Sequence, residues 1–138
     1  MENLRIEDLS VGDWVKYETM PTKVMYINGF DSVIRGKASN GNIVIAHIDC
    51  FKPIPITAEV LEMNGWLPPR AEIYRDTWWW TNKVDKAIEA SEYQGEWQLT
   101  IIEQKEIQCN YRLGLGLKYV HHLQHALRLA GAGKEIVV

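Results

Sequence analysis

The chain has 138 residues, of which 46% are hydrophobic, and it contains six tryptophans, a composition typical of one folded globular domain rather than of a disordered chain. Its charges are spread evenly: residues 1–57 carry 6 basic and 7 acidic residues, and residues 58–138 carry 9 and 11. No basic half or basic run supplies the positive field that most nucleic-acid-binding proteins need, so binding to nucleic acid is not favoured.

The sequence also lacks signals for secretion, membrane insertion and metal coordination. The first ten residues, MENLRIEDLS, contain no basic start followed by an apolar run, and no apolar stretch reaches the roughly 20 residues that cross a bilayer. Cys50 and Cys109 have no metal-like spacing. We therefore expect a cytoplasmic protein without membrane contact, whose cysteines are small core residues in a reducing compartment.

Short runs rich in β-formers and separated by turn signals fill the first 50 residues. The predicted strands cover residues 14–17, 23–27, 33–35 and 43–48. Simple alternation in the second run puts Val24 and Tyr26 on one face. The fourth run places three residues on a common face: Ile43, Ile45 and His47. Asn40-Gly41 predicts a type I′ hairpin turn. These features predict a small SH3-like β-barrel over residues 1–56, with an open meander packed on the C-terminal helix as the alternative.

An extended linker and a short helix follow the barrel. Pro53 and Pro55 remove backbone donors and keep the linker out of a helix. Thr57 is a good N-cap for a helix that ends at Gly65. Trp66 follows this glycine and is expected to fold back on the helix.

Residues 57–138 are predicted to form an α+β segment that makes one compact unit with the barrel. Alternation predicts strands at residues 73–80, 97–101 and 107–113, whereas residues 83–91 fit helix and strand equally. The longest helical period covers residues 117–130, with Gly131 as its stop, and its apolar stripe should cover the hairpin formed by the last two strands. The final KEIVV is expected to add an edge strand. The predicted fold is therefore α+β: a barrel, a linker helix, an antiparallel hairpin layer and a C-terminal helix packed on it.

The predicted C-terminal helix carries one half of the candidate interaction surface. His121 and His125 lie four residues apart, and a helical wheel places both opposite the apolar stripe with Lys118 between them. The segment lacks the glutamate of a zinc-protease motif and offers no third ligand nearby. We therefore expect no metal here, and a face open to solvent or to a partner.

Three consecutive tryptophans are the other half of this surface. On a strand, Trp79 must point away from the side to which Trp78 and Trp80 point. One face of the strand is therefore either covered by another layer or offers aromatic surface to a partner. No catalytic pattern accompanies these residues, since the GLGLK segment at 114–118 has the wrong spacing for a phosphate-binding loop. We expect no cofactor and no enzymatic activity.

Three segments resemble one protein family. They are LSVGDWV (residues 9–15), PIPIT with the helix up to Asn-Gly-Trp (residues 53–66), and LKYVHHLQHAL (residues 117–127). In this order they resemble a family of uncharacterised proteins encoded in gut-bacterial genomes and their prophages or mobile elements, with a PIPLT…NGF…YVHQLQ pattern. Ile56, Trp66 and His122 depart from that pattern. The resemblance spans the chain and implies a bacterial, phage-related intracellular protein, without implying catalytic residues.

The leading hypothesis is a non-enzymatic binding or adaptor protein that acts through a protein partner or as a homo-oligomer. The second is a nucleic-acid-binding module that uses the small barrel, which rests on fold analogy alone. The third is an enzyme whose site is assembled from residues far apart in the sequence.

Overall fold

A computed structural model of the chain describes residues 4–68, 77–81, 86–94, 96–104, 108–129 and 135–138. The chain divides into two units, each with its own antiparallel sheet. The first unit comprises Met1–Pro55, Tyr119–His121 and Val138, and the second comprises Ile56–Lys118 and His122–Val137. None of the described helices is long and apolar enough to span a membrane.

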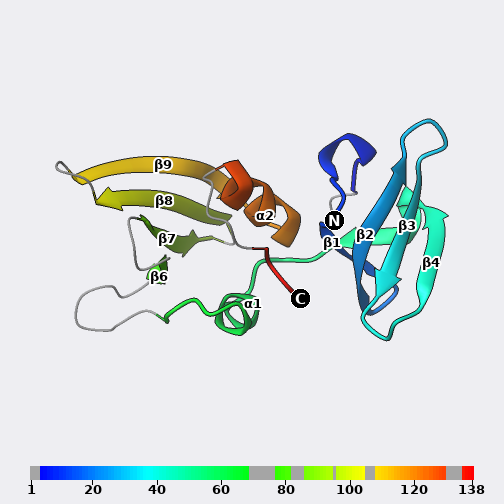
Figure 1. Cartoon of the computed structure of the whole chain (residues 1–138), viewed down its shortest axis with the longest axis horizontal. Helices are drawn as coiled ribbons and strands as arrows, with labels where there is room; N and C mark the ends of the chain where they lie inside the picture. The colour runs from blue at the N-terminus through cyan, green and yellow to red at the C-terminus, as the bar shows by residue number, and fades with distance from the viewer. Residues whose placement is uncertain (1–3, 69–76, 82–85, 95, 105–107, 130–134) are drawn as a thin grey trace. The chain divides into compact units, whose positions relative to one another are not determined.

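The first unit begins with a 3₁₀ turn, η1 (Ile6–Asp8), and contains five strands: β1 (Trp14–Tyr17), β2 (Met20–Asn28), β3 (Val33–Ala38), β4 (Ile43–His47) and β5 (Phe51–Pro53). Their order is β4-β3-β2-β1-β5, and all neighbours are antiparallel. A second 3₁₀ turn, η2 (Ile48–Cys50), ends the four-strand meander, and β5 returns to pair with β1. This is the strand order of an SH3-like barrel, and the sheet curls into a half-barrel (Figure 1). The predicted small barrel is confirmed.

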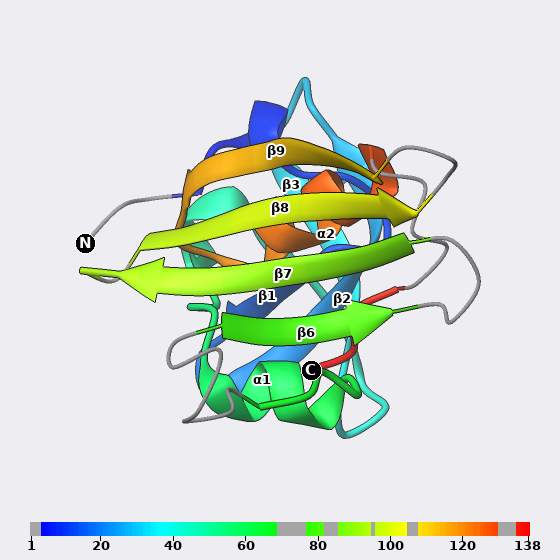
Figure 2. The same cartoon turned by 90° about the vertical axis from the view of Figure 1, so that its left-hand side faces the viewer.

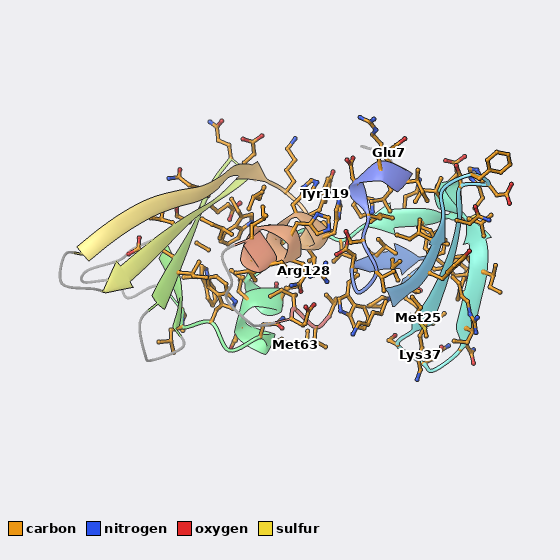
Figure 3. All side chains as sticks on the ribbon, turned by 45° about the horizontal axis from the view of Figure 1, so that its top comes forward. Glu7, Met25, Lys37, Met63, Tyr119 and Arg128 are labelled. Carbon is orange, nitrogen blue, oxygen red and sulfur yellow. The ribbon has the colours of Figure 1, made fainter. Side chains whose placement is uncertain are left out.

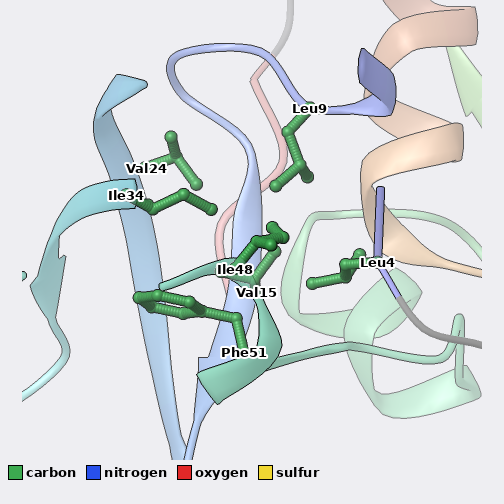
Figure 4. Packing of buried hydrophobic residues seen from close by; sticks show 7 residues of the cluster. All are labelled: Leu4, Leu9, Val15, Val24, Ile34, Ile48 and Phe51. Atoms are coloured by element: carbon green, nitrogen blue, oxygen red, sulfur yellow. The ribbon is translucent and has the colours of Figure 1, made fainter. Parts of the chain in front are cut away.

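Seven buried apolar residues form the core of the half-barrel (Figure 4): Leu4, Leu9, Val15, Val24, Ile34, Ile48 and Phe51. The Tyr17 ring lies against this cluster and contacts Phe51 in a tilted arrangement, with 5.5 Å between the ring centroids. Cys50 is exposed at the end of η2, so the expectation that it is a core residue is wrong. It lies next to Phe51, and the alternation there turns Phe51 inward and leaves the thiol outside.

A β-bulge in β2 reverses the predicted faces of that strand. The register with β3 shifts between Val24 and Tyr26, so that Met25 is an extra residue without a partner. Val24 opposes Gly36 and is 1% exposed, whereas Tyr26 opposes Arg35 and is 59% exposed. The prediction that Val24 and Tyr26 share a face is therefore wrong, because one inserted residue inverts a two-residue period.

The hairpin between β3 and β4 is confirmed, but its turn is not type I′. Gly41 has φ 91°, and Asn40 is not among the residues with positive φ. The Gly41 N–H donates to the Ala38 carbonyl (2.9 Å), and the Ala38 N–H donates to the Asn42 carbonyl (2.8 Å). The connection is a tight turn followed by one glycine in the left-handed region. It needs one residue with positive φ, whereas a type I′ turn needs two.

The helix of the second unit has the predicted ends. Helix α1 (Ala58–Met63) begins after Thr57, whose Oγ1 accepts from the Val60 N–H at 3.3 Å. Gly65 has φ 82°, and the Trp66 N–H donates back to the Leu61 carbonyl at 3.0 Å. Trp66 is 2% exposed, so it folds back on the helix as predicted.

The second sheet has the strand order β6-β7-β8-β9. The strands are β6 (Thr77–Thr81), β7 (Lys86–Tyr93), β8 (Glu96–Gln104) and β9 (Gln108–Leu117). Residues 83–91, which fit helix and strand equally in the sequence, form a strand from Lys86 onward. Residues 83–85, and residues 73–76 of the predicted tryptophan strand, lie outside the described part. Alternation in β8 is confirmed, since Trp97 and Leu99 are buried whereas Gln98 and Thr100 are half-buried.

Helix α2 (Val120–Leu129) lies against one face of this sheet (Figures 1 and 2). It buries Leu123, Ala126 and Leu127, which confirms the predicted covering helix. The helix starts three residues later than predicted because Leu117 still belongs to β9 and Tyr119 forms a β-bridge with Pro55. The predicted stop at Gly131 lies outside the described residues.

The C-terminal tail is held by side-chain amides and is not the predicted edge strand. The Ile136 N–H donates to Gln124 Oε1 (2.5 Å), and Ile136 is 1% exposed. The Asn64 side chain accepts from the Val137 N–H and donates to the Val137 carbonyl, both at 2.8 Å. Because one primary amide offers both a donor and an acceptor, Asn64 pairs with the tail as a neighbouring strand would.

Candidate interaction surface

Charge is sorted by secondary structure in the half-barrel. All five charged residues on its strands are cations: Lys16, Lys23, Arg35, Lys37 and Lys52. The six carboxylates described in this unit all lie in turns or 3₁₀ turns: Glu7, Asp8, Asp13, Glu18, Asp31 and Asp49. The two signs therefore cancel in the count of charges but occupy different parts of the surface.

The strand register brings three of these cations together with exposed apolar side chains. One row across β2, β3 and β4 is Lys23, Lys37 and Ile43. The next row is Tyr26, Arg35 and Ile45. All six side chains are exposed, with Ile45 66% and Ile43 47% exposed, and Figure 3 shows Lys37 projecting from the sheet. We call these six residues the outer barrel face.

The bulge is what adds the aromatic ring to this face. If Met25 were paired normally instead of bulging, the alternation that buries Val24 would also bury Tyr26. With the bulge, Tyr26 lies directly opposite Arg35, and Met25 is itself 46% exposed. Bulges that re-aim a side chain in this way are enriched next to functional sites.

The cations of the outer barrel face are not neutralised within the described part of the chain. Lys23 lies directly opposite Lys37, and like charges in this position destabilise a sheet. Neither lysine, nor Arg35, forms an ion pair with any described residue. The isolated protein thus has a local excess of positive charge that an anionic group would relieve.

One end of the face is bordered by a rigid turn that presents an aromatic ring. Phe30 is 97% exposed at the β2–β3 turn. The Asn28 Oδ1 atom accepts from the Phe30 N–H (3.1 Å) and the Asp31 N–H (3.2 Å), which fixes the turn. His47 lies on β4 near this end, and its Nδ1 accepts from the Asp49 N–H at 3.2 Å. The same Nδ1 atom lies 3.3 Å from Asp49 Oδ2.

The two edges of the half-barrel sheet differ in their protection. Edge strand β5 has three residues, and they include Lys52 and Pro53. Edge strand β4 has five residues, IVIAH, without a proline, lysine or carboxylate. Natural edge strands are usually protected by such residues, so β4 is the open edge of this sheet.

None of the described residues of the predicted interaction surface is fully exposed. His121 is 2% exposed and its ring stacks on Tyr119, with centroids 5.9 Å apart, so the wheel-based prediction that it faces solvent is wrong. Residues 118–120 make backbone hydrogen bonds to Ile54 and Ile56. These contacts cannot be predicted from the helical period of the sequence. His125 and Trp78 are half-buried, and the side chains of Trp79 and Trp80 lie outside the described part.

The histidines of α2 and one carboxylate of the second sheet are titratable side chains. The described residues include no cluster of three potential metal ligands. On β7, partial burial raises the pKa of Glu89 above its ordinary value of 4.5. The two residues directly paired with it are Trp79 and Thr100, and neither is a carboxyl or a base.

Comparison of the chain with protein-family models, with curated proteins and with solved structures gives no match. The resemblance to a bacterial, prophage-associated family therefore stays a prediction.

Sequence reasoning missed the outer barrel face although two of its signals are present in the sequence. One is that the predicted strands contain Lys16, Lys23 and Arg35 but no carboxylate. The other is the alternation that puts Ile43, Ile45 and His47 on one face of the fourth predicted strand. The face became visible only with the register, because the bulge decides which residues of β2 lie beside Arg35 and Lys37.

Proposed function

We propose that this protein is a non-enzymatic binding or adaptor protein, and that its outer barrel face docks an acidic segment of a protein partner. The observation that carries the proposal is the unneutralised Lys23, Arg35 and Lys37 in register with Tyr26, Ile43 and Ile45. Cations beside aliphatic and aromatic side chains are suited to docking, since complementary charge steers the partner and apolar contact holds it.

A protein partner is favoured over nucleic acid by the chemistry of the face. Ile43 and Ile45 make up a third of its residues and have no ring on which a base could stack. Three cations neutralise few phosphates, and the whole chain has a net charge of −3. A bacterial, prophage-related origin and a cytoplasmic location, which the sequence predicts, belong to this proposal.

The test uses a fluorescein-labelled seven-residue peptide that alternates glutamate with valine, and measures its binding by fluorescence anisotropy at two salt concentrations. Lys37→Glu should weaken binding roughly 2- to 30-fold, because it turns an attraction into a repulsion, each worth about 0.2–1 kcal/mol at an exposed site. Lys52→Glu is the matched control. It makes the same charge change on an exposed strand, also opposite a lysine, but at the other edge of the sheet.

Three outcomes would contradict the proposal. The first is no binding of the peptide at millimolar concentration. The second is an equal loss in both variants, which would mean that net charge and not this face is responsible. The third is tighter binding of a twelve-residue oligo-dT with a steep salt dependence, which would favour the nucleic-acid alternative.

A further inference from the structure

We infer that the acidic segment binds as an additional antiparallel strand on the open edge of β4. This inference rests on the proposed function and adds the binding mode and the pattern of residues that the partner must have. Strand addition draws affinity from main-chain hydrogen bonds and specificity from alternate side chains.

The hydrogen bonds around the β3–β4 hairpin determine which backbone groups of β4 are free to pair. The Ile48 N–H donates to the Ser32 carbonyl, and the Ala38 N–H donates to the Asn42 carbonyl, both at 2.8 Å. In an antiparallel ladder, bonded residues recur every second position. Residues 44 and 46 therefore direct their N–H and carbonyl groups toward β3.

The alternate residues direct theirs toward the open edge. Ile43 and Ile45 each point one donor and one acceptor away from β3, and His47 points its N–H there, because its carbonyl accepts the first bond of η2. Their side chains are the exposed ones of this strand. An incoming strand thus meets two pairs of backbone groups and one further N–H, and its residues opposite Ile43 and Ile45 extend the outer barrel face by one position.

The side chains around this edge specify the partner's sequence pattern. Residues of the added strand opposite Ile43 and Ile45 are separated from Lys37 and Arg35 by the width of β4. The β-carbons of these acidic residues and of the two cations are therefore about 10 Å apart. Long side chains of opposite charge span that gap over the isoleucines. The intervening residues of the added strand lie beside half-buried Val44 and Ala46. The partner segment therefore alternates acidic residues on the outer side with β-branched apolar residues on the inner side.

A second copy of this chain fits the edge less well than an acidic segment does. Two β4 strands paired antiparallel would match isoleucine with isoleucine, but each copy would bring Arg35 and Lys37 and no carboxylate to the common face. Charge complementarity thus selects a different partner. Light scattering is expected to give the mass of one chain, and a dimer that dissociates on Ile45→Lys would overturn this choice.

Backbone methylation of the probe separates strand addition from simple charge attraction. In an antiparallel pair, the glutamates opposite Ile43 and Ile45 donate their N–H groups to β4, whereas the valine N–H groups point away. N-methylation of those glutamates should therefore weaken the glutamate–valine peptide at least about tenfold. N-methylation of the valines, which adds the same number of methyl groups, should change its affinity less than about threefold.

Amide exchange on the protein gives a second readout. On addition of the unmodified peptide, exchange of the Ile45 and His47 amides should slow at least about tenfold, while that of Val44 and Ala46, already bonded to β3, should change little. Equal effects of the two methylated peptides together with unchanged Ile45 exchange would overturn strand addition and leave the proposed function standing. Failure of the unmodified peptide to bind would instead overturn the proposed function itself.

Discussion

Asn64 is predicted to hold the C-terminal tail of the second unit. Its buried amide makes three hydrogen bonds of 2.8 Å: to the Val60 carbonyl, to the Val137 carbonyl and from the Val137 N–H. Asn64→Ala removes all three without adding bulk. The residue follows helix α1 as its C-cap, so helix propensity contributes little to the effect.

The decrease in the free energy of unfolding caused by Asn64→Ala can be worked out for two cases. If the tail stays docked, three bonds worth about 1 kcal/mol each disappear. If the tail detaches, Ile136 is exposed, at about 2–3 kcal/mol, and its bond to Gln124 is lost as well. Both cases give a decrease of about 2–4 kcal/mol in the free energy of unfolding.

Urea denaturation followed by tryptophan fluorescence measures this decrease, and amide exchange of Ile136 reports release of the tail. Asn40→Ala is the control, because that exposed side chain accepts a single bond from the Asn42 N–H and its loss should cost less than about 0.5 kcal/mol. Asn64→Asp should be worse than Asn64→Ala at neutral pH, because a carboxylate oxygen would then face two carbonyl oxygens. A loss below about 0.5 kcal/mol for Asn64→Ala, with unchanged Ile136 exchange, would refute the proposed role of the amide.

Three further changes test the two sheets. Gly36→Ala should destabilise the half-barrel by about 1–3 kcal/mol in urea, because its Cβ would lie 2.5 Å from a methyl group and 3.0 Å from a carbonyl oxygen of β2. Deletion of Met25 should leave the circular dichroism spectrum and the β2–β3 register intact, since this residue has no partner, whereas deletion of Arg35 should prevent folding, because β3 pairs with β4 without a bulge and the faces of β3 would be inverted. Glu89→Gln should raise stability at pH 7. The pKa of Glu89 is raised in the folded chain, so its ionisation opposes folding above that pKa, and the gain should vanish as the pH falls below 4.5.

Each of these predictions has an internal contrast. Gly29→Ala, where no atom lies within 4 Å of the added Cβ, should leave stability unchanged or slightly higher. Equal effects of the two glycine substitutions would argue against close packing at Gly36. A Met25-deleted protein with exposed Val24 would contradict the bulge. A gain from Glu89→Gln that persists at pH 3 would mean that its carboxylate charge is not the cause.

Local sequence rules predicted the elements whose determinants lie within a few residues. Thr57 and Gly65 set the ends of α1, because a side-chain acceptor and a positive φ act within one turn. The short strands of the half-barrel follow from β-propensity and turn residues. The segment 83–91 could not be assigned, because Val84 and Ile88 fit both periods. From Lys86 the choice of strand depends on its pairing with β6 and β8, which the period of the segment itself does not show.

By itself, the sequence determined the α+β class, the small barrel and the apolar stripe of the C-terminal helix, since alternation and helical period are written in neighbouring residues. Only the tertiary structure decided which residues share a surface. One unpaired residue, Met25, moves Tyr26 from the core side of β2 to the side of Arg35. Conversely, His121 is buried although a wheel drawn from its helix alone places it in solvent. A face of a strand or helix is defined by what pairs with it and packs on it, and those partners lie outside the segment whose period is read.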